Sequence, residues 1–75
     1  MSKKLPSVSG KQVVRALEQI GYHVIRIRGS HHFMEREGKT SVAVPVHANR
    51  DIARGTLRSI LSDIGLSDDE FADLL

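Results

Sequence analysis

The 75-residue sequence contains no cysteine and no long apolar run. The absence of cysteine excludes a disulfide scaffold and thiolate metal sites, and it favours a reducing compartment. No stretch approaches the roughly 18 consecutive apolar residues that a membrane-spanning helix requires. The basic segment at residues 1–6 lacks the apolar core of a signal peptide. We therefore expect a cytoplasmic protein that does not enter a membrane.

A chain of this length has room for one domain, so we expect a single domain over residues 1–75. Such a domain buries only about 60% of the surface that its unfolded chain exposes, which limits its stability. Residues 1–58 contain all 11 Lys and Arg with four acids, whereas residues 59–75 contain five acids and no base. A basic body favours an anionic partner such as nucleic acid. The acidic residues at positions 59–75 are equally consistent with a solvated helix face that binds no partner.

Residues 9–21 predict the first helix. Ser9 and Gln12 have the spacing of a capping box, in which each side chain bonds the other residue's backbone N–H. Gly21 suits a C-terminal cap, since it tolerates left-handed geometry. The helix is therefore expected over residues 10–20. Apolar residues recur there at helical spacing, namely Val13, Val14, Leu17 and Ile20.

Residues 23–46 predict three strands. Residues 23–28 alternate in polarity, which places Ile25 and Ile27 on one face and Arg26 and Arg28 on the other. Glycine-containing turns at residues 29–30 and 37–39 separate this strand from strands at residues 31–36 and 40–46. The last strand presents Val42, Val44 and Val46 on one face. Because Pro45 donates no backbone hydrogen bond, this strand is an edge strand or ends at Pro45.

The C-terminal third predicts two more helices. Thr56 suits the N-cap of the first, and Ser67 with Glu70 forms a second capping box. Together the elements predict an α+β fold, ordered α-β-β-β-α with a short C-terminal helix, in which the helices pack on one sheet face. The apolar residues of these two helices are Leu57, Ile60, Leu61 and Ile64, then Phe71, Leu74 and Leu75.

Chemistry-bearing residues gather between Arg26 and Arg36. This segment contains three arginines, the adjacent His31 and His32, and a glycine turn. An imidazole exchanges a proton near neutral pH. When the 2′-hydroxyl of RNA attacks the neighbouring phosphate, cleavage requires a base, an acid and cations at the phosphate. Gly29 allows a backbone N–H to approach a phosphate closely. The segment is therefore a candidate site for RNA cleavage, but adjacent histidines on a strand are more often a surface feature than a catalytic pair.

Two rival interpretations use nearby residues. His31 and His32 point to opposite faces of a regular strand, so they do not readily hold one metal ion. Pairing either with His47 leaves no acid at a recognisable ligand spacing, so we expect no metal. Arg54 and Arg58 flank a helix N-terminus, which favours an anion. An ordinary cap with solvated arginines fits the same residues.

Three motifs occur together in a fixed order: Gly29-Ser30-His31-His32, Val44-Pro45-Val46-His47 and Gly55-Thr56-Leu57-Arg58. With the residues around them, the sequence resembles the HicA toxin family of bacterial toxin–antitoxin modules from about Leu5 to Phe71. The surrounding residues are Leu5-Pro6, Gly10-Lys11, Val13, Ala16-Leu17, Gly21-Tyr22, Arg28, Ile60-Leu61 and Gly65-Leu66.

The resemblance implies a fold like the double-stranded-RNA-binding domain, ribosome-independent mRNA cleavage and growth arrest. It also implies neutralisation by a HicB-type antitoxin, with DNA contacted only through the antitoxin complex. We expect His31 to act as general base or acid, with His32 in reserve, and no cofactor. The expected RNA-binding residues are Arg26, Arg28, Gly29, Ser30 and Arg58. The alternative is an RNA-binding module of the double-stranded-RNA type without catalysis.

Which histidine is exposed depends on which neighbour enters the core. If Met34 faces the helices, His31 and Phe33 share the open face with Arg26 and Arg28. If Phe33 is the core residue, as its larger apolar surface favours, His32 is the exposed one. A register shift or a bulge near Gly29 would reconcile an exposed His31 with a buried Phe33.

Overall fold

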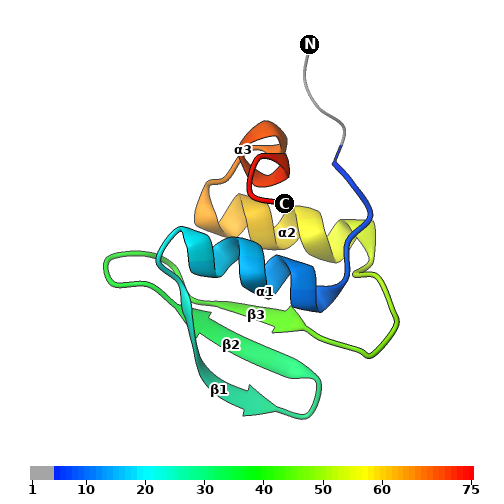
Figure 1. Cartoon of the computed structure of the whole chain (residues 1–75). Helices are drawn as coiled ribbons and strands as arrows, with labels where there is room; N and C mark the ends of the chain where they lie inside the picture. The colour runs from blue at the N-terminus through cyan, green and yellow to red at the C-terminus, as the bar shows by residue number, and fades with distance from the viewer. Residues whose placement is uncertain (1–4) are drawn as a thin grey trace.

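The computed structural model describes residues 5–75 of the chain, so the basic segment at residues 1–4 lies outside the described residues. The sheet order is β1-β2-β3, and both pairings are antiparallel. Figure 1 shows this predicted α-β-β-β-α order, with a short helix at the end. The elements are α1 (Gly10–Gln19), β1 (His23–Arg28), β2 (His31–Glu35), β3 (Val42–Pro45), α2 (Arg54–Ile64) and α3 (Asp68–Ala72).

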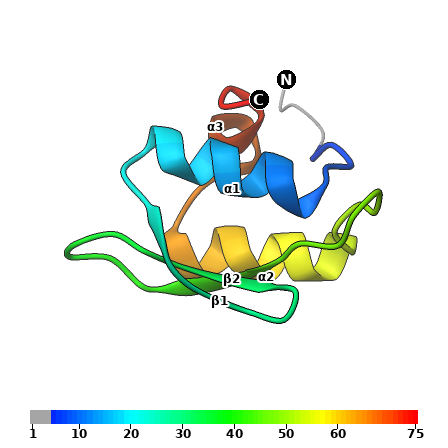
Figure 2. The same ribbon diagram turned by 60° about the horizontal axis from the view of Figure 1, so that its bottom comes forward.

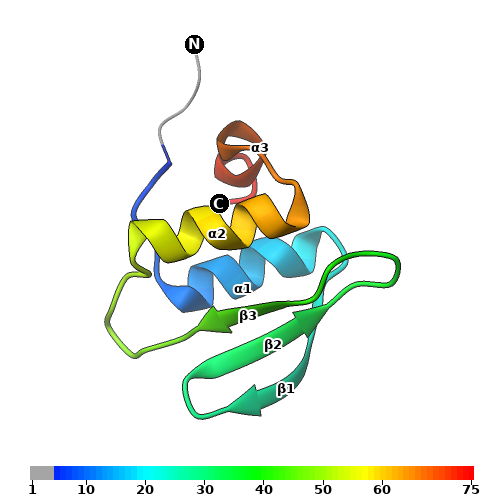
Figure 3. The same ribbon diagram turned by 180° about the vertical axis from the view of Figure 1, so that it is seen from behind.

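The helices and the sheet form separate layers. Helices α1 and α2 lie on one face of the sheet, and α3 packs on the side of these helices away from the sheet (Figures 1 and 3). The other face of the sheet is left open, as the turned view in Figure 2 shows. One core of buried residues joins the sheet, α1, α2 and α3, among them Val13, Leu17, Tyr22, Met34, Val44, Leu57 and Phe71.

The capping box of α1 forms as predicted. The Ser9 hydroxyl accepts from the Gln12 N–H, and the Gln12 side chain accepts from the Ser9 N–H at 2.8 Å. Gly21 has a φ of 99°, the positive value expected after the helix end. At the other end, a Cβ on Gly10 would overlap the Pro45 carbonyl oxygen and lie 2.8 Å from the Val46 Cα. Helix α1 therefore starts in direct backbone contact with the end of β3.

A β-bulge corrects the predicted alternation of β1. Val24 lies opposite Met34 but Arg26 lies opposite Phe33, so Ile25 is an extra residue. After the bulge, Ile27 lies on the helix side of the sheet, opposite His32. The prediction that Ile25 and Ile27 share one face is wrong, because one inserted residue shifts the alternation. They are 52% and 60% exposed.

The core residue of β2 is Met34, which is fully buried, and not Phe33. Met34 pairs with Val42, and His32 pairs with Val44, so the two buried valines of β3 set which face of β2 turns inward. The preference for Phe33 based on its size is therefore wrong. The register with a neighbouring strand decides the face for all residues of β2 at once.

Both later strands are shorter than predicted, and β3 ends at Pro45 at the edge of the sheet. The predicted Thr56 N-cap of α2 is also wrong, since the cap is Ala53 and no side chain bonds the first turn. Ile52, just before this cap, is nearly buried and its N–H donates to the Val8 carbonyl at 2.8 Å. This distant contact sets where α2 begins, one turn earlier than Thr56.

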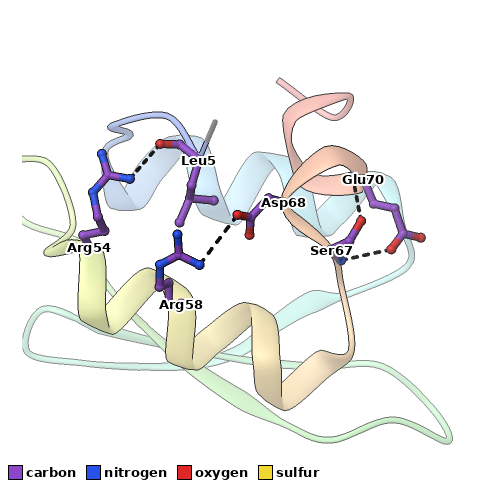
Figure 4. A network of polar contacts seen from close by, with 6 residues as sticks. All are labelled: Leu5, Arg54, Arg58, Ser67, Asp68 and Glu70. Atoms are coloured by element: carbon purple, nitrogen blue, oxygen red, sulfur yellow. Dashed lines mark hydrogen bonds and ion pairs between the residues drawn. The ribbon is translucent and has the colours of Figure 1, made fainter. Parts of the chain in front are cut away.

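The second capping box forms at α3, as predicted, between Ser67 and Glu70 (Figure 4). The Ser67 N–H donates to the Glu70 carboxylate at 3.0 Å. This bond, together with the bond to the Ser67 hydroxyl, lowers the pKa of Glu70 below its ordinary value. One turn later Phe71 is fully buried, which attaches α3 to the core.

Candidate active site

A row of cationic and aromatic side chains lies on the open face of the sheet. Arg26, Phe33 and Ala43 are paired across the three strands, as are Arg28, His31 and Pro45. Directly paired residues share a face, and these alternate with the buried Met34 row. Arg26 and Arg28, two of the three arginines predicted to bind RNA, therefore share the open face with His31.

His31 begins β2 and is exposed. Arg28 lies directly opposite it on β1. The imidazole centroid is 6.4 Å from the Phe33 ring centroid, and the Arg26 guanidinium carbon lies 4.7 Å from that same ring centroid. Phe33, although outside the core, thus makes a cation–π contact with Arg26. Phe33 therefore contacts the Arg26 guanidinium and lies near the His31 ring.

The turn before His31 is formed by Gly29 and Ser30. Gly29 has a φ of 59°, in the left-handed region that favours glycine, and nothing lies within 4 Å of a Cβ built on it. The Ser30 carbonyl accepts a hydrogen bond from the Val46 N–H at 2.6 Å. The turn is therefore open on the outside and attached to the end of β3 on the inside.

Beside this turn is a hollow of about 490 Å³, which we call the β3–α2 hollow. His31 lines one side, and the loop between β3 and α2 supplies His47, Arg50 and Asp51. Ala53 and Thr56, at the start of α2, also line the hollow. Figure 1 shows why these segments meet, because the β1–β2 turn, the β3–α2 loop and the start of α2 lie at the same end of the molecule.

His32 lies on the opposite face of β2 and is half-buried. It lines a separate hollow with Lys11, Arg15 and Glu18 of α1. Its Nδ1 atom is buried and has no hydrogen-bond partner among residues 5–75. The two adjacent histidines are therefore separated by the sheet, and His32 does not share the open face with the arginine row.

Arg58 is also separated from His31. It lies in the helix layer, where its guanidinium is 3.6 Å from the Asp68 carboxylate of α3 (Figure 4). Arg54 donates to the Leu5 carbonyl at 3.0 Å and so holds the segment before α1 against α2. Of the residues predicted to bind RNA, the structure gathers Arg26, Arg28, Gly29 and Ser30 around His31 and leaves Arg58 elsewhere.

Sequence reasoning did not assign a functional role to three residues of the β3–α2 hollow: His47, Arg50 and Asp51. A signal for His47 was present, because it follows Pro45 by two residues and so falls on the same side of an extended chain. Arg50 and Asp51 had no such signal, since the course of the loop is set by distant contacts. Within residues 5–75, no three His, Asp or Glu side chains form a group that could hold a metal ion.

No helix in residues 5–75 combines the length and apolar character required to cross a membrane. The described part of the chain is thus a small α+β domain with the architecture of a double-stranded-RNA-binding domain, carrying an exposed imidazole beside two arginines on its open sheet face.

The model of one protein family, described as the HicA toxin of bacterial toxin–antitoxin modules, matches residues 10–66. That span is most of the chain, and the protein belongs to the HicA toxin family. The search of curated proteins found no match.

Proposed function

We propose that this toxin is an endoribonuclease that cleaves mRNA in the cytoplasm, with His31 as a proton-transfer group. The observation that supports this most is the position of His31. Its ring is exposed on an uncovered sheet face, and Arg28 lies directly opposite on the next strand. An RNA backbone on this face would bring its phosphate to a cation and its 2′-hydroxyl to an imidazole.

The neighbouring residues have distinct roles in this proposal. Arg26 and Arg28 bind phosphates, and the Phe33 ring orients the first of them. Gly29 and Ser30 offer backbone groups to the same RNA strand, since the outer side of their turn is unobstructed. No metal is required, because the 2′-hydroxyl of the RNA is the nucleophile. His32 and Arg58 are not assigned to this site, because they lie on the helix side of the sheet.

The partner that we propose is a HicB-type antitoxin whose acidic residues cover the arginine row. Such a partner would block the substrate and be attracted by the cations that bind RNA. DNA contact would come only through the antitoxin, which would supply the element that reads the bases.

The test compares histidines in the purified protein and in cells. His31→Ala is expected to remain folded, to lower RNA cleavage by at least about 100-fold, and to abolish growth arrest. His23→Ala is the matched control, because His23 is exposed at the far end of β1, opposite Glu35. Full cleavage and toxicity in a folded His31→Ala protein would remove His31 from the mechanism.

The architecture also fits a second function, an RNA-binding module without catalysis, since the double-stranded-RNA-binding domain recognises RNA by shape and phosphate contacts. Incubation of the wild-type protein with RNA in EDTA distinguishes the two. Cleaved RNA supports a metal-independent ribonuclease, whereas retention of intact RNA supports the binding module.

A further inference from the structure

The β3–α2 hollow contains a second imidazole, that of His47, to which no role has been assigned above. His31 and His47 both line this hollow, and both are exposed. Of the other histidines, His32 lies on the opposite face and His23 lies at the far end of β1. The hollow is therefore the place in residues 5–75 where two histidines face one accessible space.

The strand register explains how these two rings come together. His31 pairs with Pro45, and the bond from the Val46 N–H to the Ser30 carbonyl continues the pairing one residue beyond β3. Side chains of an extended chain alternate, so Val46 falls on the helix side and His47 on the side of Pro45. Val46 indeed lines the hollow that contains His32. His47 is thus a diagonal neighbour of His31, at a spacing that long or aromatic side chains can bridge.

The loop that carries His47 is held in place on both sides. The Arg50 N–H donates to the His47 carbonyl at 3.3 Å, closing a turn in which Asn49 adopts a φ of 59°. The backbones of Asp51 and Ser9 form an isolated antiparallel β-bridge, and the N–H of Ile52 donates to the Val8 carbonyl. The position of His47 relative to His31 is therefore set by backbone bonds and does not depend on an unattached loop.

Cleavage of RNA by its 2′-hydroxyl requires two proton transfers on opposite sides of the phosphorus. As the bond from the 2′-oxygen to phosphorus forms, a base takes the 2′-hydroxyl proton. As the bond from phosphorus to the 5′-oxygen breaks, an acid protonates that oxygen. The products are a 2′,3′-cyclic phosphate and a 5′-hydroxyl. Since the entering and leaving oxygens are in line, one ring cannot contact both.

We propose that His47 is a catalytic residue, the general acid that protonates the departing 5′-oxygen, while His31 is the general base. This inference rests on the ribonuclease function proposed above. Arg28 lies directly opposite His31, where it would hold the phosphate next to the ring that takes the 2′-hydroxyl proton. His47 lines the β3–α2 hollow with Arg50, a second cation for the phosphate, and with the carboxylate of Asp51, which would accept the other N–H of the donating ring.

The experiment uses two RNAs of the same sequence. In one, the 5′-oxygen at the bond that the wild-type protein cleaves is replaced by sulfur, which departs as a thiolate without a proton. His47→Ala is expected to lower kcat/KM on ordinary RNA by about 100- to 10,000-fold. On the sulfur-containing RNA its loss is expected to be at least about tenfold smaller. His31→Ala is expected to lose activity on both, because the base is still needed.

A pH profile provides a second readout. For ordinary RNA, kcat/KM of the wild-type protein is expected to fall at high pH as the acid loses its proton, and His47→Ala is expected to lack this fall. His47→Gln is a second variant, for which we expect the same losses as for His47→Ala. Circular dichroism establishes that the variants are folded, and His23→Ala is the control. Equal losses of His47→Ala on both RNAs, or undiminished cleavage of ordinary RNA, would overturn the proposal. Absence of cleavage by the wild-type protein would instead contradict the ribonuclease function itself.

Discussion

At the scale of single residues, His31 and His32 are adjacent but have different surroundings. His31 is exposed beside Arg28, whereas the Nδ1 atom of His32 is buried without a hydrogen-bond partner. A buried polar atom that loses its bond to water costs about 1–3 kcal/mol. We therefore expect the position of His32 on the helix side to lower the stability of the fold.

This predicts the effect of His32→Leu. An apolar side chain in this position removes the unpaired atom, so we expect the free energy of unfolding to be unchanged or to rise by about 1 kcal/mol. RNA cleavage should be retained. Urea unfolding and a cleavage assay provide the measurements, and His31→Leu is the matched control, with a stability change within about 0.5 kcal/mol. Loss of cleavage in a stable His32→Leu protein would transfer the essential role to His32.

At the scale of elements, the contact between α1 and the end of β3 determines how the site is assembled. Gly10, the first residue of α1, lies against Pro45 and Val46, and the next residue, His47, lines the β3–α2 hollow. A side chain at position 10 has no space, because backbone atoms surround it and they cannot move aside as a flexible side chain can.

We therefore expect Gly10→Ala to destabilise the protein by about 1–3 kcal/mol, since α1 must move away from β3. Gly55→Ala is the control, because nothing lies within 4 Å of a Cβ built on Gly55. That substitution is expected to be neutral or to stabilise α2 by up to about 1 kcal/mol, as alanine favours the helix. Thermal and urea unfolding measure both. Similar stabilities of the two variants would refute the close contact at Gly10.

At the scale of the whole molecule, the acidic C-terminal residues lie away from the arginines of the open sheet face. Arg26 and Arg28 lie on the open sheet face, while the acidic residues near the C-terminus belong to α3 and its surroundings in the helix layer. The exposed Ile25 and Ile27 lie on the same strand as the two arginines. This surface, cationic with apolar residues at its edge, is the one that we expect the antitoxin to cover.

This arrangement predicts how salt and two matched arginines affect antitoxin binding. Raising the ionic strength from about 0.01 M to about 0.1 M shortens the screening length from about 30 to about 10 Å, so the association rate should fall by about tenfold or more. Arg28→Ala should lower the low-salt association rate. Arg58→Ala should leave it unchanged, because Arg58 lies in the helix layer beside Asp68. Stopped-flow kinetics measures these rates, and equal effects of the two substitutions would argue against docking on the open face.

Much of this protein is determined by its sequence alone. Both capping boxes, the glycine after α1, the turn at Gly29 and the end of β3 at Pro45 were predicted and form. So was the order of elements. Each of these features depends on residues within three or four positions of one another, and such interactions are visible in a linear chain.

Only the tertiary structure decided which side chains meet. The bulge at Ile25, the burial of Met34 in place of Phe33, and the start of α2 at Arg54 all depend on pairing with distant segments. The meeting of His31 and His47 depends on the register of β2 with β3. A shift of one residue in that register would turn every side chain of the strand to the other face. The sequence pattern therefore predicted the strands but could not determine which face of each strand turns toward the helices.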